Sequence, residues 1–119
     1  TAMAAAAVVE MAGGTASESA EAVAIALKNL LGLVCDPVAG LVEAPCTKRN
    51  AMGAAIAMVA GDMALAGVKS VIPPDEVIEA MYRIGRDMPV SLKETALGGL
   101  AATPTGRELE RKIFGESEI

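Results

Sequence analysis

The two cysteines of the chain, Cys35 and Cys46, flank a single loop and are the side chains best suited to chemistry. Cys46 comes just before a predicted helix, where the free N–H groups and the helix dipole should stabilise a thiolate. Thiolates bind soft metals and iron–sulfur clusters, but two of them are too few for a complete zinc or cluster site. A free cysteine can equally be a small buried apolar residue, and composition alone leaves that interpretation open.

Three polar residues, Lys48, Arg49 and Asn50, follow in the first turn of the same predicted helix. Cations are disfavoured at a helix start because the dipole repels them, so a nearby anion would explain their position. A thiolate-bound cluster or a substrate carboxylate would serve, and the planar guanidinium of Arg49 suits a carboxylate better than the ammonium of Lys48. The alternative is a solvated helix end with long side chains in water.

Two hydroxyl groups, those of Thr103 and Thr105, could also reach such a site as hydrogen-bond donors. Their alternative role is to cap the last helix, since Thr105 and Glu108 have the spacing of a capping box. Asp36, which precedes Pro37, is better explained as a turn former than as a general base. The residues therefore suggest ligands and substrate contacts but do not identify a catalytic base.

The composition predicts that helices position these groups. Hydrophobic residues make up 53% of the 119 residues, with one Phe, one Tyr and no Trp, and alanine favours helices. We expect an all-α single domain of about five to six helices, with a long apolar loop at 32–45 between the second and third. The predicted helices cover residues 2–12, 15–31, 47–66 and 74–88, and a last helix begins at Pro104 or Gly106 and runs to Phe114. Within the third, Gly53, Ala57 and Gly61 form a stripe that should pack against another helix.

Several classes of function are disfavoured. The net charge of −5 and the lack of a basic run argue against nucleic-acid binding and attachment to anionic membranes. The apolar stretch 51–68 is interrupted by Asp62 and is better explained as a buried helix than as a membrane span. With no His, zinc sites built on His and Cys–His nucleophiles are excluded within this chain. The start at Thr1 lacks a signal peptide's basic region and lies inside an apolar helical pattern, so we expect a cytoplasmic protein with further sequence upstream.

Two long segments resemble a known family. Residues 33–53, LVCDPVAGLVEAPCTKRNAMG, closely resemble the cluster loop of the bacterial iron–sulfur-dependent L-serine dehydratases. Residues 94–106, ETALGGLAATPTG, resemble the C-terminal signature of that family. The similarity covers essentially the whole chain and is strongest to the alpha subunit of the two-subunit form. It implies that residues 1–119 are the C-terminal portion of the alpha-chain domain, without the N-terminal part of that domain.

The resemblance also implies a cofactor. In the family three cysteines hold a 4Fe–4S cluster, and Cys35 and Cys46 match the second and third of them. The first would lie shortly upstream of Thr1. The remaining iron keeps an open position and acts as a Lewis acid on the serine hydroxyl, and no pyridoxal phosphate is used. The activity implied is deamination of L-serine to pyruvate and ammonia, in amino-acid degradation and gluconeogenesis.

The partners implied are L-serine and a beta subunit or N-terminal domain of the same enzyme, in a homo-oligomer. With only two cysteine ligands, the 119-residue chain alone should be inactive and bind no stable cluster. The alternative function is non-catalytic: a helical subunit-interface domain whose two thiols are structural or redox-responsive.

Overall fold

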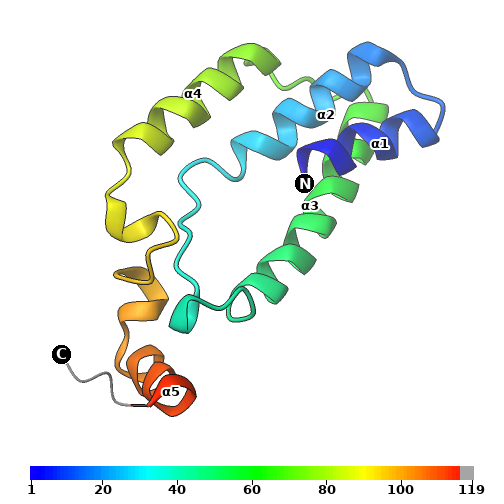
Figure 1. The fold of residues 1–119 in the computed structure, drawn as a ribbon. Coiled ribbons are helices and arrows are strands. Elements are labelled where there is room, and N and C mark those ends of the chain that lie inside the picture. The colour runs from blue at the N-terminus through cyan, green and yellow to red at the C-terminus, as the bar shows by residue number, and fades with distance from the viewer. Residues whose placement is uncertain (116–119) are drawn as a thin grey trace. The chain divides into compact units, whose positions relative to one another are not determined.

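Helices account for nearly all regular structure in the computed structural model, which describes residues 1–115 (Figure 1). The α-helices are α1 (Ala2–Met11), α2 (Ala16–Lys28), α3 (Cys46–Leu65), α4 (Pro74–Asp87) and α5 (Pro104–Phe114). Three short 3-10 helices are η1 (Val38–Gly40), η2 (Val90–Leu92) and η3 (Gly99–Ala102). Within residues 1–115 there is no strand, only an isolated bridge between Cys35 and Lys93. The predicted all-α class is confirmed, while the last four residues of the predicted domain lie outside the described part.

The start of α2 has a capping box formed by Thr15 and Glu18. The Glu18 N–H donates to the Thr15 hydroxyl at 3.2 Å, and the Thr15 N–H donates to the Glu18 carboxylate at 2.7 Å. The end of α2 comes earlier than predicted, at Lys28. There the Asn29 side-chain amide donates to the Ile25 carbonyl at 2.7 Å, so a local side-chain bond takes the place of further helical turns.

The chain divides into two compact units, residues 1–32 with 51–87 and residues 33–50 with 88–119. In the first unit α1 and α2 lie side by side (Figure 1) and share a core with α3. That core consists of Ala5, Val9, Ala22, Ile25, Ala26, Ala57, Ala60 and Ala64. Because most of these side chains are methyl groups, the helices can approach one another closely.

The predicted small-residue stripe of α3 is confirmed as a helix contact. A β-carbon at Gly61 would lie 2.6 Å from the Val8 Cγ1 of α1, and one at Gly53 would lie 2.6 Å from the Thr1 hydroxyl. Ala57, between them, is fully enclosed. A side chain at Gly61 would have to displace Val8 of α1, whereas at Gly53 the nearest atom is the end of the Thr1 side chain, which can rotate away.

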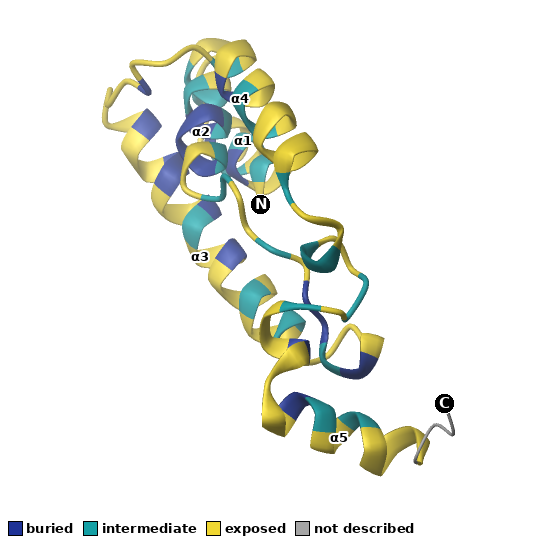
Figure 2. Cartoon of the chain, turned by 90° about the vertical axis from the view of Figure 1, so that its left-hand side faces the viewer, coloured by how far each residue is buried: buried dark blue, intermediate teal, exposed yellow. Residues whose placement is uncertain are grey.

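The opposite face of α3 is exposed, which corrects the prediction that 51–68 is a buried helix (Figure 2). Met52, Met58, Val59 and Met63 all have more than a third of their surface exposed. An apolar groove of about 420 Å³ runs beside this face and includes Ile25 of α2. Burial is one-sided because α1 and α2 cover only the stripe of small residues. No helix within residues 1–115 is both long and apolar enough to cross a bilayer.

In the second unit α5 packs on η1 and η3. Gly106, in the first turn of α5, is buried, and a β-carbon there would lie 2.5 Å from the Leu100 carbonyl oxygen. The apolar loop is only partly buried: Pro37 and Ala39 are buried, while Leu41 is exposed. The unit therefore gathers the loop, the start of α3 and the C-terminal signature segment.

Candidate functional site

Cys35 has a firmly held main chain and an accessible side chain. Its N–H donates to the Leu92 carbonyl at 2.9 Å, and its carbonyl accepts from the Glu94 N–H at 2.7 Å. The thiol is free and the residue is exposed. These two backbone hydrogen bonds hold the main chain of Cys35 more firmly than an ordinary loop would. The thiol therefore projects from a defined position.

Cys46 is the first residue of α3, one position further into the helix than predicted. It follows a cis peptide between Ala44 and Pro45, and its thiol is free and partly buried. The N–H groups of Lys48 and Arg49 both bond to the Pro45 carbonyl at 3.1 Å. Cys46 thus lies within the first turn of α3, at the positive end of the helix dipole.

The two thiols belong to the same unit and influence one another electrostatically. Desolvation, the Glu94 carboxylate and the charge of Cys46 raise the pKa of the Cys35 thiol, and Arg49 opposes them. A thiol with a raised pKa stays protonated unless a cation stabilises the thiolate. The surroundings of Cys35 therefore favour the protonated thiol.

Asp36 is the least expected residue of the site. Its side chain is 2% exposed, yet it carries a carboxylate. One oxygen accepts from the Arg49 Nη1 at 2.5 Å and the other from the Leu100 N–H at 2.6 Å. Burial raises the pKa of this carboxyl, but the bonds from Leu100 and Arg49 outweigh it and hold the pKa below its ordinary value. A buried aspartate needs a charged or hydrogen-bonding partner. The presence of Asp36 inside an apolar loop is therefore the sequence signal from which an ion pair could have been predicted.

Lys48, Arg49 and Asn50, in the first turn of α3, differ in exposure and in hydrogen bonding. Lys48 and Asn50 are exposed. Arg49 is 30% exposed, and its Nη1 also donates to the Val34 carbonyl at 3.2 Å. The anion that offsets the charge of Arg49 in this structure is therefore the Asp36 carboxylate, whereas Lys48 extends from the helix start into solvent.

Of the two predicted threonines, Thr103 is the cap of α5. Its hydroxyl accepts from the Gly106 N–H at 3.1 Å and donates to the Leu100 carbonyl at 2.7 Å. The predicted capping box of Thr105 with Glu108 is wrong, because Pro104 begins the helix and places Thr105 inside it. Both threonines remain exposed and belong to the same unit as the thiols.

The donor set suits part of a soft-metal site. Within residues 1–115 no group of three or more Cys, Asp or Glu side chains is arranged to hold a metal ion. The two free thiols fit a thiophilic metal or cluster in their chemistry, and they fall short of it in number. A complete site would need further ligands.

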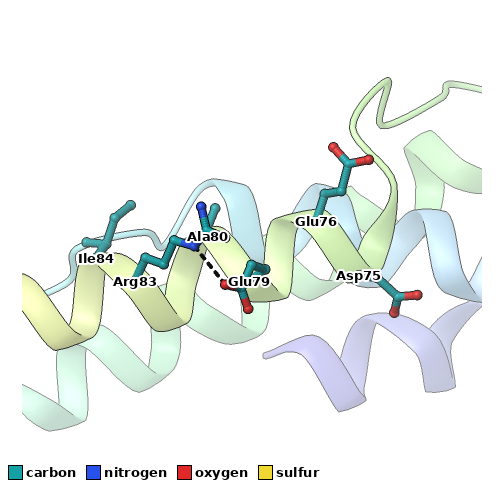
Figure 3. Close-up of a pocket in the computed structure, with 6 residues that line it drawn as sticks. All are labelled: Asp75, Glu76, Glu79, Ala80, Arg83 and Ile84. Carbon is teal, nitrogen blue, oxygen red and sulfur yellow. Dashed lines mark hydrogen bonds and ion pairs between the residues drawn. The ribbon is translucent and has the colours of Figure 1, made fainter.

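A separate hollow lies along α4 and contains none of the predicted site residues (Figure 3). Its lining is Asp75, Glu76, Glu79, Ala80, Arg83 and Ile84. Arg83 donates to Glu79 at 2.7 Å, an exposed pair one helical turn apart. All of these lining residues belong to α4, so the hollow lies on the solvent-exposed face of that one helix.

The site therefore defines an all-helical protein that presents two free thiols beside a cationic helix start. The chain belongs to the serine dehydratase alpha chain family, whose sequence profile matches residues 1–101. It is 76% identical over 113 residues to the probable L-serine dehydratase, alpha chain, of Bacillus subtilis, covering 95% of this chain and 38% of that protein.

Other relatives carry the same name. The probable L-serine dehydratase, alpha chain, of Latilactobacillus sakei is 63% identical over 98% of this chain and 56% of its own length. The L-serine dehydratase, alpha chain, of Peptoniphilus asaccharolyticus is 52% identical over 99% of this chain and 40% of its own length. The chain thus spans between about two fifths and a little over half of these relatives.

Proposed function

We propose that this chain is the cluster-bearing part of an enzyme that deaminates L-serine to pyruvate and ammonia. The observation that carries the proposal is the pair of free thiols, Cys35 and Cys46, held in one unit beside the start of α3. Membership of the serine dehydratase alpha chain family supports it, as do the names of the relatives.

Cys35 and Cys46 would hold a 4Fe–4S cluster, with a third thiolate from outside the 119 residues. When bound, the cluster supplies a Lewis acid that helps the serine hydroxyl leave as water, without pyridoxal phosphate.

The serine carboxylate would bind at the first turn of α3. Lys48 supplies an exposed cation there, Asn50 an exposed amide, and the helix N–H groups add a favourable dipole. Arg49 would take part only through the nitrogens left by its bonds to Asp36 and Val34. The exposed hydroxyls of Thr103 and Thr105 are further candidates for substrate contacts.

The partners of the chain would be a beta subunit or an N-terminal domain of the same enzyme, in a homo-oligomer located in the cytoplasm. Exposed apolar side chains on α3, among them Met58 and Val59, support the proposal that a partner covers this face of α3 in the assembled enzyme. The metabolic role would be amino-acid degradation that feeds gluconeogenesis.

Anaerobic reconstitution of the complete enzyme tests this function. The wild-type protein should take up iron and sulfide, turn brown and form pyruvate from L-serine. Cys35→Ser and Cys46→Ser should lose both cluster and activity, while Glu79→Gln, which breaks an exposed ion pair on α4, should lose neither. The 119-residue chain alone should be inactive. A colourless, iron-free enzyme would overturn the proposal and favour a helical interface domain with structural or redox-responsive thiols.

A further inference from the structure

The buried carboxylate of Asp36 joins three segments that are distant in the sequence. It follows Cys35 directly, its ion-pair partner Arg49 lies in the first turn of α3 that begins with Cys46, and its second partner is the Leu100 N–H of η3. A buried ion pair contributes little net stability compared with apolar packing, so its use at this point calls for another reason.

Gly99 and Arg49 leave the Asp36 side chain little room to move. Gly99 has a φ of 60°, and a β-carbon at that position would overlap the Asp36 carboxylate. Arg49 is fixed by a second bond, from Nη1 to the Val34 carbonyl at 3.2 Å, on the other side of Cys35. The residues before and after Cys35 are therefore both tied to one guanidinium on α3.

The main chain of Cys35 is held independently by its bonds to Leu92 and Glu94. With Asp36 and Val34 bound to Arg49, little freedom remains between the Cys35 backbone and the first turn of α3. Cys46 is three residues before Arg49 on that same helix. The bonds of Arg49 thus tie the residues on both sides of Cys35 to the helix that begins with Cys46.

We propose that Asp36 and Arg49 are positioning residues that set the separation of the Cys35 and Cys46 thiols, so that both ligate the same iron–sulfur cluster. This inference rests on the proposed function for the identity of the ligand. It gives Arg49 a role at the thiol pair, and it leaves Lys48 as the cation of the first turn that faces solvent.

The first test uses a probe that contains no iron, so that it is independent of the proposed function. Phenylarsine oxide forms a bond to each of two neighbouring thiols and binds tightly only when both are correctly spaced. In the complete protein, Cys35→Ser and Cys46→Ser identify the fraction of binding that needs this pair. We expect Asp36→Asn and Arg49→Gln each to weaken that fraction roughly 10–100-fold, as for residues that orient metal ligands.

A double-mutant cycle tests whether Asp36 and Arg49 act as a unit, and circular dichroism tests whether the variants remain folded. If the pair acts as a unit, combining Asp36→Asn with Arg49→Gln should weaken binding no more than either change alone. Glu79→Gln, which breaks the exposed pair with Arg83, is the matched control and should leave binding unchanged. Arg49→Lys keeps the charge, and it should give an intermediate affinity with the helical circular dichroism signal of the wild type.

The second test uses the electron paramagnetic resonance spectrum of the reconstituted complete enzyme after reduction with dithionite, which converts a diamagnetic 4Fe–4S cluster into its paramagnetic one-electron-reduced form. We expect Asp36→Asn and Arg49→Lys to change the cluster spectrum and to speed loss of iron to a chelator about tenfold or more. Unchanged arsenical affinity together with an unchanged spectrum in folded Arg49→Lys would overturn the proposal. A wild-type protein that binds the arsenical through both thiols but assembles no cluster would instead overturn the proposed function and leave the positioning role intact.

Discussion

Gly99 and Asp36 approach so closely that a single β-carbon at position 99 would overlap the aspartate carboxylate. The Leu100 N–H that follows Gly99 donates to that carboxylate at 2.6 Å. The second glycine of the Gly-Gly loop in the C-terminal signature is thus explained by a buried acid that lies more than sixty residues earlier in the chain.

Replacing Gly99 tests this contact directly. Gly99→Ala should lower the free energy of unfolding by at least ~2 kcal/mol, because it combines an unfavourable positive φ with overpacking. Gly85→Ala is the matched control, since Gly85 lies in α4 with nothing within 4 Å of its β-carbon position. That change should raise the free energy of unfolding by ~0.5–1 kcal/mol. Urea titrations that show equal effects for the two variants would contradict the contact.

The stripe on α3 predicts a second packing effect. Gly61→Leu should destabilise the chain by ~1–3 kcal/mol, because the side chain would meet Val8 of α1. Met58→Leu, on the exposed face of the same helix, should change stability by less than about 0.5 kcal/mol. Thermal unfolding of both variants is the measurement, and an unchanged midpoint for Gly61→Leu would show that the stripe tolerates bulk.

The cap of α5 gives a clear contrast between two neighbouring threonines. Thr103→Ala should cost ~1 kcal/mol of stability, because the Gly106 N–H loses its acceptor. Thr105→Ala should be close to neutral, since Thr105 lies inside the helix and alanine is the better helix former. Chemical denaturation distinguishes them, and a larger loss at Thr105 would mean that the helix begins later.

Acid should weaken the second unit through Asp36. Its pKa in the folded state lies below its ordinary value, so its stabilising contribution is complete above the unfolded value of about 3.9. That contribution is lost as the pH falls through the folded-state pKa. Asp36→Asn should therefore be less stable at neutral pH but should lose less stability than the wild type as the pH falls below about 4.

Glu18→Gln is the control for this titration. The backbone and hydroxyl bonds from Thr15 also lower the pKa of Glu18, but that carboxylate is solvent-exposed. Water screens its interactions, so its removal should alter the acid limb much less than Asp36→Asn does. Equal acid sensitivity of wild type and Asp36→Asn, followed by circular dichroism, would be inconsistent with a buried ionised Asp36.

The division of roles between Lys48 and Arg49 is testable in the complete enzyme. Lys48→Ala should raise the KM for L-serine about tenfold with unchanged iron content, because it would remove the proposed charged contact to the serine carboxylate. Arg49→Lys should weaken serine use by roughly one to two powers of ten and should also disturb the cluster. If Lys48→Ala leaves serine turnover intact, or acts only through loss of iron, the helix start does not bind substrate.

Local signals were enough to predict the helices. The alanine-rich composition, the Thr15 capping box, Pro74 and the glycines that end α1 and α3 act within a few residues of where they occur. The small-residue stripe of α3 is likewise a periodic pattern that can be seen in the chain itself. The same patterns marked Cys35, Cys46 and the first turn of α3 as the chemically active region.

The role of Asp36 could be decided only by the tertiary structure. Next to Pro37 it has every local feature of a turn former, whereas its carboxylate is buried because Arg49 and Leu100 arrive from other parts of the chain. The exposed face of α3 was missed for the related reason that an apolar pattern shows what can be buried, not what covers it. Burial and ion pairing depend on which segments meet in space, and short-range sequence patterns do not contain that information.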